Sequence, residues 1–132
     1  MQYSISGSAT SKYAGAIIKG ENKVKFGINT DPSLLSPVDL LLSAFASCCL
    51  KNIERFSEFM HFEYESAEIQ VDGIRKEKPP MIEKINFSIQ LNSNQEQINT
   101  DLLLRNLQKF GTIYNTLKVV CEIEGEIHLV KK

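Results

Sequence analysis

The sequence has no tryptophan, only three cysteines and almost no net charge across its 132 residues. Three cysteines, two of them adjacent, cannot form the framework of disulfides that holds small secreted domains together. The formal net charge of −1 gives no basic excess for binding nucleic acid. The short basic run at residues 75–78 contains a glutamate and precedes two prolines, which favours a solvated loop. We therefore expect no nucleic-acid partner.

Long hydrophobic runs are also missing. The most apolar stretch, residues 38–50, is shorter than the roughly 20 residues that cross a bilayer, so we expect no membrane partner. The first eight residues lack the basic and apolar regions of a secretory signal, which predicts a cytoplasmic location. His61 and His128 are far apart and belong to no metal-ligand spacing pattern, and no phosphate-binding glycine loop is present. We expect neither a metal nor another cofactor.

A strongly apolar helix signal follows Ser36. Ser36 is a suitable N-cap, Pro37 suits the first helical position, and Asp39 can complete a capping box. The helix is predicted to reach about Met60. Because residues 38–50 carry only three polar side chains, we expect this helix, with both of its cysteines, to be surrounded by protein.

The segments on either side of this helix show strand and helix patterns. Residues 1–28 are expected to form short strands, with turns at Gly7, Gly15 and Gly20. Later elements are predicted by alternating or helical spacing of apolar residues: strands at 67–71 and 85–91 with an excursion at 73–80 between them, a helix capped by Asn99 or Thr100 and ending at Gly111, and a last strand over 119–129.

This order of elements predicts a single domain over residues 1–132 with an α+β fold, in which sheet and helices are segregated. One small sheet cannot cover a helix that is apolar on nearly every side. A second copy of the chain is therefore expected to cover the rest, most simply in a two-fold homodimer.

Five segments occur in a characteristic order: SPVDLLLSAFASC at 36–48, AEIQVDGIR at 67–75, PP at 79–80, INFSI at 85–89 and YNTL at 114–117. In this order and spacing the chain resembles the OsmC/Ohr superfamily along nearly its whole length. The resemblance implies the OsmC-like fold, an intertwined homodimer with two central helices in its core and a site at each side of the subunit interface. It also implies a thiol peroxidase that reduces organic hydroperoxides in oxidative stress defence, with Cys48 at the position of the reactive cysteine.

The chain departs from the peroxidase members of that superfamily at three places. Where those members carry a glutamate just after the proline, this chain has Val38, with Asp39 one position later. Their N-terminal arginine has no counterpart, because the first arginine here is Arg55. Their resolving cysteine would fall at about Gly111.

The chemistry of peroxide reduction indicates which residues could support Cys48. A thiolate is the nucleophile, and an ordinary cysteine is mostly protonated at neutral pH, so the site needs groups that favour the charged form. Helical spacing places Asn52 one turn and Arg55 two turns along the face of Cys48. Asp39 and Cys49 are further candidates. The expected substrates are hydroperoxides with apolar tails, in a pocket lined by Leu41, Phe45 and Phe56.

A sulfenic acid on Cys48 would have to be reduced by a second thiol. The side chain of Cys49 points about 100° away round the helix. Cys121 falls on the apolar face of the last predicted strand, where a buried structural residue is the simpler interpretation. An external thiol reductant is the remaining candidate.

Three interpretations stay open at this point. The first is the thiol peroxidase. The second is a catalytically degenerate dimer that binds a small hydrophobic ligand at the subunit interface. The third is a structural or regulatory dimer in which Cys48 and Cys49 only pack in the core.

Overall fold

The structure is a computed structural model that describes residues 1–28 and 33–131. The described residues form an α+β fold with two small sheets and three helices, as the sequence predicts. The chain divides into two compact units, Met1–Leu41 and Leu42–Lys132. The prediction of one domain over residues 1–132 stays a prediction.

The first unit contains a three-stranded antiparallel meander. Its strands are β1 (Ser6–Ala9), β2 (Gly15–Lys19) and β3 (Asn22–Phe26), in that order. Gly20 makes the predicted turn with a φ of 59°, a conformation that glycine adopts without strain. The predicted turns at Gly7 and Gly15 are wrong, because both residues lie within strands. Gly15 pairs with Phe26, whose ring occupies the space that a side chain at position 15 would need.

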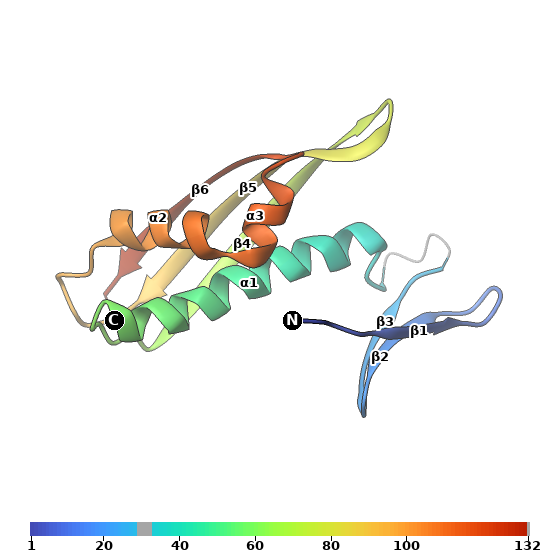
Figure 1. Ribbon diagram of the computed structural model, residues 1–132, viewed down its shortest axis with the longest axis horizontal. Coiled ribbons are helices and arrows are strands. Elements are labelled where there is room, and N and C mark those ends of the chain that lie inside the picture. The colour runs from blue at the N-terminus through green and yellow to red at the C-terminus, as the bar shows by residue number, and fades with distance from the viewer. Residues whose placement is uncertain (29–32, 132) are drawn as a thin grey trace. The chain divides into compact units, whose positions relative to one another are not determined.

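The second unit contains the larger sheet, in the order β4-β5-β6 (Figure 1). Its strands are β4 (Ser66–Glu77), β5 (Pro80–Asn92) and β6 (Glu122–Val130). β4 and β5 are antiparallel, whereas β5 and β6 are parallel. The predicted excursion at 73–80 is wrong: both strands continue to a tight hairpin, past a register shift between Ile74 and Arg75. The last strand begins after Cys121, later than predicted.

The described residues form three helices, and side-chain caps mark the start of the first two. They are α1 (Pro37–Phe59), α2 (Thr100–Phe110) and α3 (Thr112–Leu117). The predicted capping box of α1 is confirmed, since the Asp39 N–H donates to Ser36 Oγ at 3.1 Å and the Ser36 N–H donates to Asp39 Oδ2 at 2.9 Å. Asn99 caps α2 by accepting from the N–H of Leu102. The six-residue α3 is not predicted by the sequence pattern.

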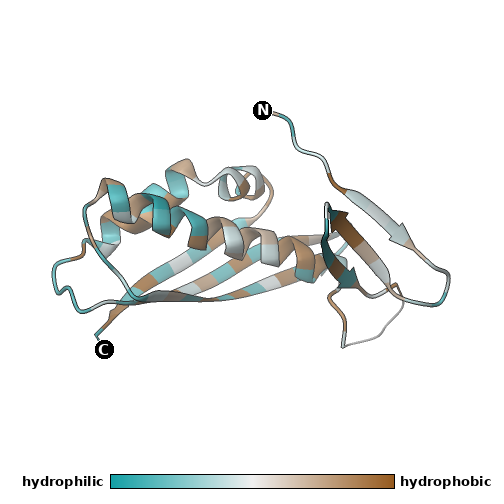
Figure 2. Ribbon diagram, turned by 90° about the horizontal axis from the view of Figure 1, so that it is seen from below, coloured by the Kyte–Doolittle hydropathy of each residue, from teal (hydrophilic) through white to brown (hydrophobic). Residues whose placement is uncertain are grey.

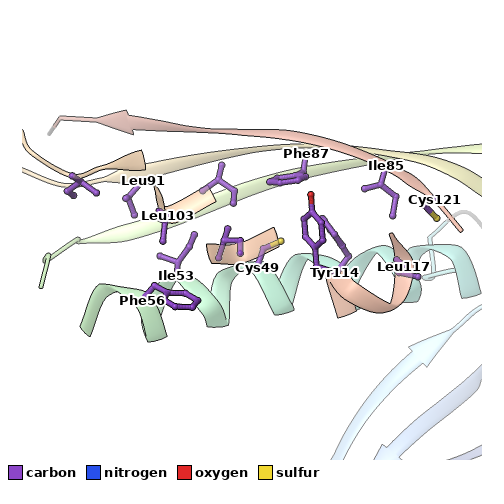
Figure 3. Close-up of a cluster of buried hydrophobic side chains, with 14 of the residues drawn as sticks. Cys49, Ile53, Phe56, Ile85, Phe87, Leu91, Leu103, Tyr114, Leu117 and Cys121 are labelled. Carbon is purple, nitrogen blue, oxygen red and sulfur yellow. The ribbon is translucent and has the colours of Figure 1, made fainter. Parts of the chain in front are cut away.

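Within the second unit, the helices lie on one face of the β4-β5-β6 sheet (Figure 2). Along the strands, apolar residues alternate with polar ones, so that one face is buried. In this core the rings of Phe45, Phe87 and Tyr114 meet, with centroids 5.4 to 6.2 Å apart. Figure 3 shows Phe87 and Tyr114 among the buried side chains. Such aromatic contacts add to the stabilisation from buried area alone.

The single chain covers only one side of α1, and cover of the rest by a second copy of the chain stays a prediction. Its buried residues form one stripe along the helix, at Phe45, Cys49, Ile53, Phe56 and Ser57. Spacings of three and four residues place these side chains on one face. Other apolar side chains of α1 remain partly or largely exposed in the single chain.

Candidate functional site

Cys48 lies in the middle of α1, at the edge of the buried stripe. Its side chain is half-buried, whereas that of the adjacent Cys49 is only 2% exposed. Successive residues of a helix point about 100° apart, so Cys49 faces the core while Cys48 faces sideways. Within the single chain, protein encloses Cys49 fully and Cys48 in part, and the cover of Cys48 by a second copy of the chain stays a prediction.

Asn52 contacts the sulfur of Cys48, as the helical spacing predicts. Its side-chain amide nitrogen Nδ2 lies 3.6 Å from Cys48 Sγ and 2.9 Å from the carbonyl oxygen of Cys48. The amide N–H is a neutral hydrogen-bond donor, so Asn52 gives the sulfur a donor without adding a charge to the site.

Gly111, at the junction of α2 and α3, faces the same sulfur. A Cβ atom placed on Gly111 would lie 3.5 Å from Cys48 Sγ, which is ordinary van der Waals contact. The same atom would lie 2.8 Å from the carbonyl oxygen of Leu107 and 3.0 Å from Cβ of Tyr114, so the junction is tightly packed. Gly111 has a φ of −72°, which any residue can adopt, and close packing alone favours glycine here.

The other two thiols are buried in the core. Burial raises the pKa of the Cys49 thiol to about 12, with a smaller contribution from Cys48. Burial also raises the pKa of the Cys121 thiol, whose Sγ donates to the carbonyl oxygen of Ile82 at 3.2 Å. Cys121 is 6% exposed, in agreement with the interpretation of a small buried residue.

The guanidinium of Arg55 lies over aromatic rings. Its guanidinium carbon lies 5.4 Å from the ring centroid of Phe56, 5.8 Å from that of Phe59 and 6.0 Å from that of Phe110. These are cation–π distances. The structure thus places Arg55 on a phenylalanine cluster beyond Asn52 and gives it no contact with Cys48.

The remaining candidates are spread along α1. Asp39 closes the capping box, nine residues before Cys48. Phe45 is fully buried against Phe87 and Tyr114, Phe56 is 6% exposed and stacks on Phe110, and Leu41 is 37% exposed. The pocket that these residues would line stays a prediction.

Helical spacing alone identifies Asn52 but misses the contact with Gly111, because that contact joins segments 63 positions apart in the chain. The superfamily resemblance points to position 111 through the resolving cysteine of other members. Among residues 1–28 and 33–131, no group of three or more metal-binding side chains is present. In the same residues, no helix is long and apolar enough to cross a membrane.

Comparison with known proteins gives a family and several structural neighbours. The model of the family described as OsmC-like protein matches residues 30–125. No curated protein sequence matches the chain. Among solved structures, an OsmC-like protein from Mycoplasma pneumoniae shares 17% identity and superposes with a TM-score of 0.88, with 98% of each chain covered.

Two further neighbours carry names that refer to hydroperoxides. An organic hydroperoxide resistance protein OsmC from Legionella pneumophila, titled a predicted redox protein, shares 11% identity with a TM-score of 0.74 over 97% of this chain and 98% of that one. The organic hydroperoxide resistance protein OhrB of Bacillus subtilis shares 16% identity with a TM-score of 0.66 over 95% and 98%. At these identities the likeness shows the fold. Because the family model covers more than half of the sequence, the chain belongs to the OsmC/Ohr family of OsmC-like proteins.

Proposed function

We propose that this protein is a thiol-dependent peroxidase that reduces organic hydroperoxides through Cys48. The observation that carries the proposal is the difference between its three thiols: Cys48 is half-buried and accepts a hydrogen bond from Asn52, whereas Cys49 and Cys121 are buried in the core. Family membership and the names of the Legionella and Bacillus neighbours support the same chemistry.

The first step is a nucleophilic displacement at oxygen. The Cys48 thiolate attacks the terminal oxygen of the hydroperoxide, an S–O bond forms and the O–O bond breaks. The leaving alkoxide takes up a proton and departs as an alcohol, and Cys48 becomes a sulfenic acid. Asn52 supports this step by donating to the sulfur before the attack.

The test is sulfenic acid formation with an organic hydroperoxide, detected by a sulfenate-specific reagent and located by mass spectrometry. We expect one label per chain, on Cys48. Cys48→Ala should abolish the label, and Cys49→Ala and Cys121→Ala are matched controls that should retain it. Absence of label on Cys48 in the native protein, or label on another cysteine, would contradict the proposal.

A second candidate function is binding of a small hydrophobic ligand without turnover. It is favoured by the position of Arg55, whose guanidinium lies on three phenyl rings and not at the sulfur of Cys48. In that case Cys48→Ala should still be stabilised thermally by an apolar ligand, and native Cys48 should react slowly with hydroperoxides.

We also propose a two-fold homodimer as the functional form, at work in the cytoplasm in defence against oxidative stress. Several apolar side chains are largely exposed in the single chain, among them Val119 at 81% and Phe59 at 67%. Such side chains are candidates for cover by a second copy.

A further inference from the structure

We infer that the sulfenic acid on Cys48 is reduced by an external thiol and not by another cysteine of this chain. The inference rests on the proposed peroxidase function and concerns the second half of the same cycle. Its basis is the position of every thiol in the sequence relative to Cys48.

Cys49 is unsuitable although it is the neighbour of Cys48. Its side chain points into the core from within a continuous helix, and a bond to Cys48 would need a strained disulfide between adjacent residues and a broken helical turn. Its thiol is also held in the unreactive protonated form, because burial raises its pKa to about 12.

Cys121 is held away from the site by the core. Its Sγ donates to the Ile82 carbonyl, and the residue is 6% exposed. Figure 3 shows Cys121 at the far end of the buried cluster from Phe56, with Tyr114 and Leu117 between Cys121 and Cys49. An approach to Cys48 would require this cluster to open.

Gly111, at the junction of α2 and α3, faces the sulfur of Cys48. A Cβ atom there would be 3.5 Å from Cys48 Sγ, so a cysteine at this position would bring its own sulfur within bonding range of Cys48. Glycine has no side chain, and this chain therefore supplies no thiol at the position that faces the sulfur.

External thiols reduce the sulfenic acid and return Cys48 to the thiol in two steps. The first thiolate attacks the sulfur of the sulfenic acid, an S–S bond forms, and hydroxide leaves to become water, which gives a mixed disulfide on Cys48. A second thiol attacks the external sulfur of that disulfide and releases Cys48 as a thiol. For each hydroperoxide reduced to an alcohol and water, two external thiols are oxidised to one disulfide.

The experiment follows the fate of the sulfenic acid by intact-protein mass spectrometry, with glutathione as the probe thiol. The native protein is treated with one equivalent of organic hydroperoxide, and glutathione or a sulfenate-trapping reagent is then added in parallel samples. We expect a trapped sulfenic acid without glutathione. With one equivalent of glutathione, which leaves no second thiol to release Cys48, we expect one glutathione per chain on Cys48. Cys49→Ala and Cys121→Ala should give the same mixed disulfide.

Gly111→Cys tests the geometric part of the inference, with Gly111→Ser as the control of similar size. Because an internal thiol acts at an effective concentration of millimolar or more, glutathione supplied well below that range should label Gly111→Cys roughly tenfold less than Gly111→Ser. The lost label should be replaced by an internal disulfide between positions 48 and 111. The tight junction could prevent Gly111→Cys from folding. In that case, comparison of the mixed disulfide formed by native protein, Cys49→Ala and Cys121→Ala still tests whether an internal thiol reduces Cys48.

Two results overturn the inference alone: oxidised native protein that forms an internal disulfide to Cys49 or Cys121 without glutathione, or one that forms a disulfide-linked dimer. Failure to trap any sulfenic acid on Cys48 would overturn the proposed function as well. The trapping sample and the glutathione sample therefore separate the two failures.

Discussion

Asn52 is the one predicted supporting residue that the structure places at Cys48. Its amide binds both the sulfur and the carbonyl oxygen of Cys48, so the side chain is fixed by two contacts. The second contact positions the amide so that the first is made without further ordering of the side chain.

Asn52→Ala should slow the reaction of Cys48 with hydroperoxide by about 2- to 10-fold, which corresponds to the loss of one hydrogen bond of ~0.5–1.5 kcal/mol. Alanine retains the helix, so the unfolding midpoint should change little. The measurement is the stopped-flow rate at a fixed pH, and Lys51→Ala, on an exposed position next to Asn52, is the control. Equal rates in native protein and Asn52→Ala would refute a role for the amide.

The buried thiol of Cys49 predicts loss of stability in alkali. Its pKa is raised from 9.0 to about 12, so the folded protein holds this proton more tightly than the unfolded chain. The resulting stabilisation is full below pH 9 and is lost as the pH rises through 12. Urea unfolding should therefore show a free energy that falls between pH 9 and 12, and less steeply in Cys49→Ala. Burial and the hydrogen bond to Glu54 raise the pKa of Tyr64 to about 12 as well. Because Tyr64 is still present in Cys49→Ala, the free energy of unfolding of that variant should also fall over this pH range, but less steeply.

At the scale of elements, the start of α1 separates a structural role of Asp39 from a catalytic one. The carboxylate accepts from the Ser36 N–H, which is a capping interaction. Asp39→Ala and Ser36→Ala should each lower the free energy of unfolding by about 1 kcal/mol. The rate of Cys48 with hydroperoxide, measured on the folded variants, should stay at the native value. A large loss of rate in Asp39→Ala alone would show that Asp39 acts on the site.

Both sheets contain a glycine covered by a phenylalanine of the neighbouring strand. Gly125 on β6 pairs with Phe87 on β5, and a Cβ atom at Gly125 would lie 2.1 Å from that ring. Gly15 and Phe26 form the equivalent pair in the first unit. The ring covers backbone that glycine leaves bare, a known stabilising arrangement in sheets.

Gly125→Ala should destabilise the protein by about 1–3 kcal/mol, because the ring of Phe87 must leave its place in the core. Gly7→Ala is the matched control, since its added Cβ would lie 3.3 Å from the end of the flexible Ile17 side chain and 3.7 Å from the carbonyl oxygen of Ala16, with no aromatic ring to displace. Thermal or urea unfolding measures both. A loss no greater for Gly125→Ala than for Gly7→Ala would show that the ring moves at little cost.

At the scale of the whole molecule, the exposed apolar side chains predict self-association. Size-exclusion chromatography with light scattering should give a mass of twice 14.9 kDa at micromolar concentration. The physical reason is that burying each large apolar side chain between two copies is worth about 1.5–3 kcal/mol. A mass of 14.9 kDa throughout a concentration series would exclude the homodimer.

Local patterns predict local structure well in this chain. The capping box at Ser36 and the boundaries of α2 follow from residues three or four positions apart, and both are confirmed. Gly7 and Gly15 were wrongly expected in turns, because a glycine that lies under a neighbouring side chain has the same sequence signal as a turn glycine. The helix α3 was missed because six residues give too short a pattern.

The site could be predicted only in part, for a related reason. The proximity of Asn52 to Cys48 is a property of one helix, whereas that of Gly111 depends on how α1 packs against the α2–α3 junction. The positions of long flexible side chains are harder still to predict from the sequence. Arg55 is two helical turns from Cys48 and would have to fold back to approach it, but its guanidinium lies on the phenylalanine cluster, because the flat rings offer it apolar contact and a favourable quadrupole together.

The packing of Tyr114 between two phenyl rings makes the core visible to spectroscopy. The chain has no tryptophan, and Tyr114 is one of its four tyrosines, held 5.5 Å from Phe45 and 6.2 Å from Phe87. A rigid, asymmetric surrounding of this kind gives a phenol a near-ultraviolet circular dichroism signal, with no indole band to mask it. Loss of that signal while the far-ultraviolet spectrum persists would mark a state in which the helices and sheet remain and the packing around Tyr114 has loosened.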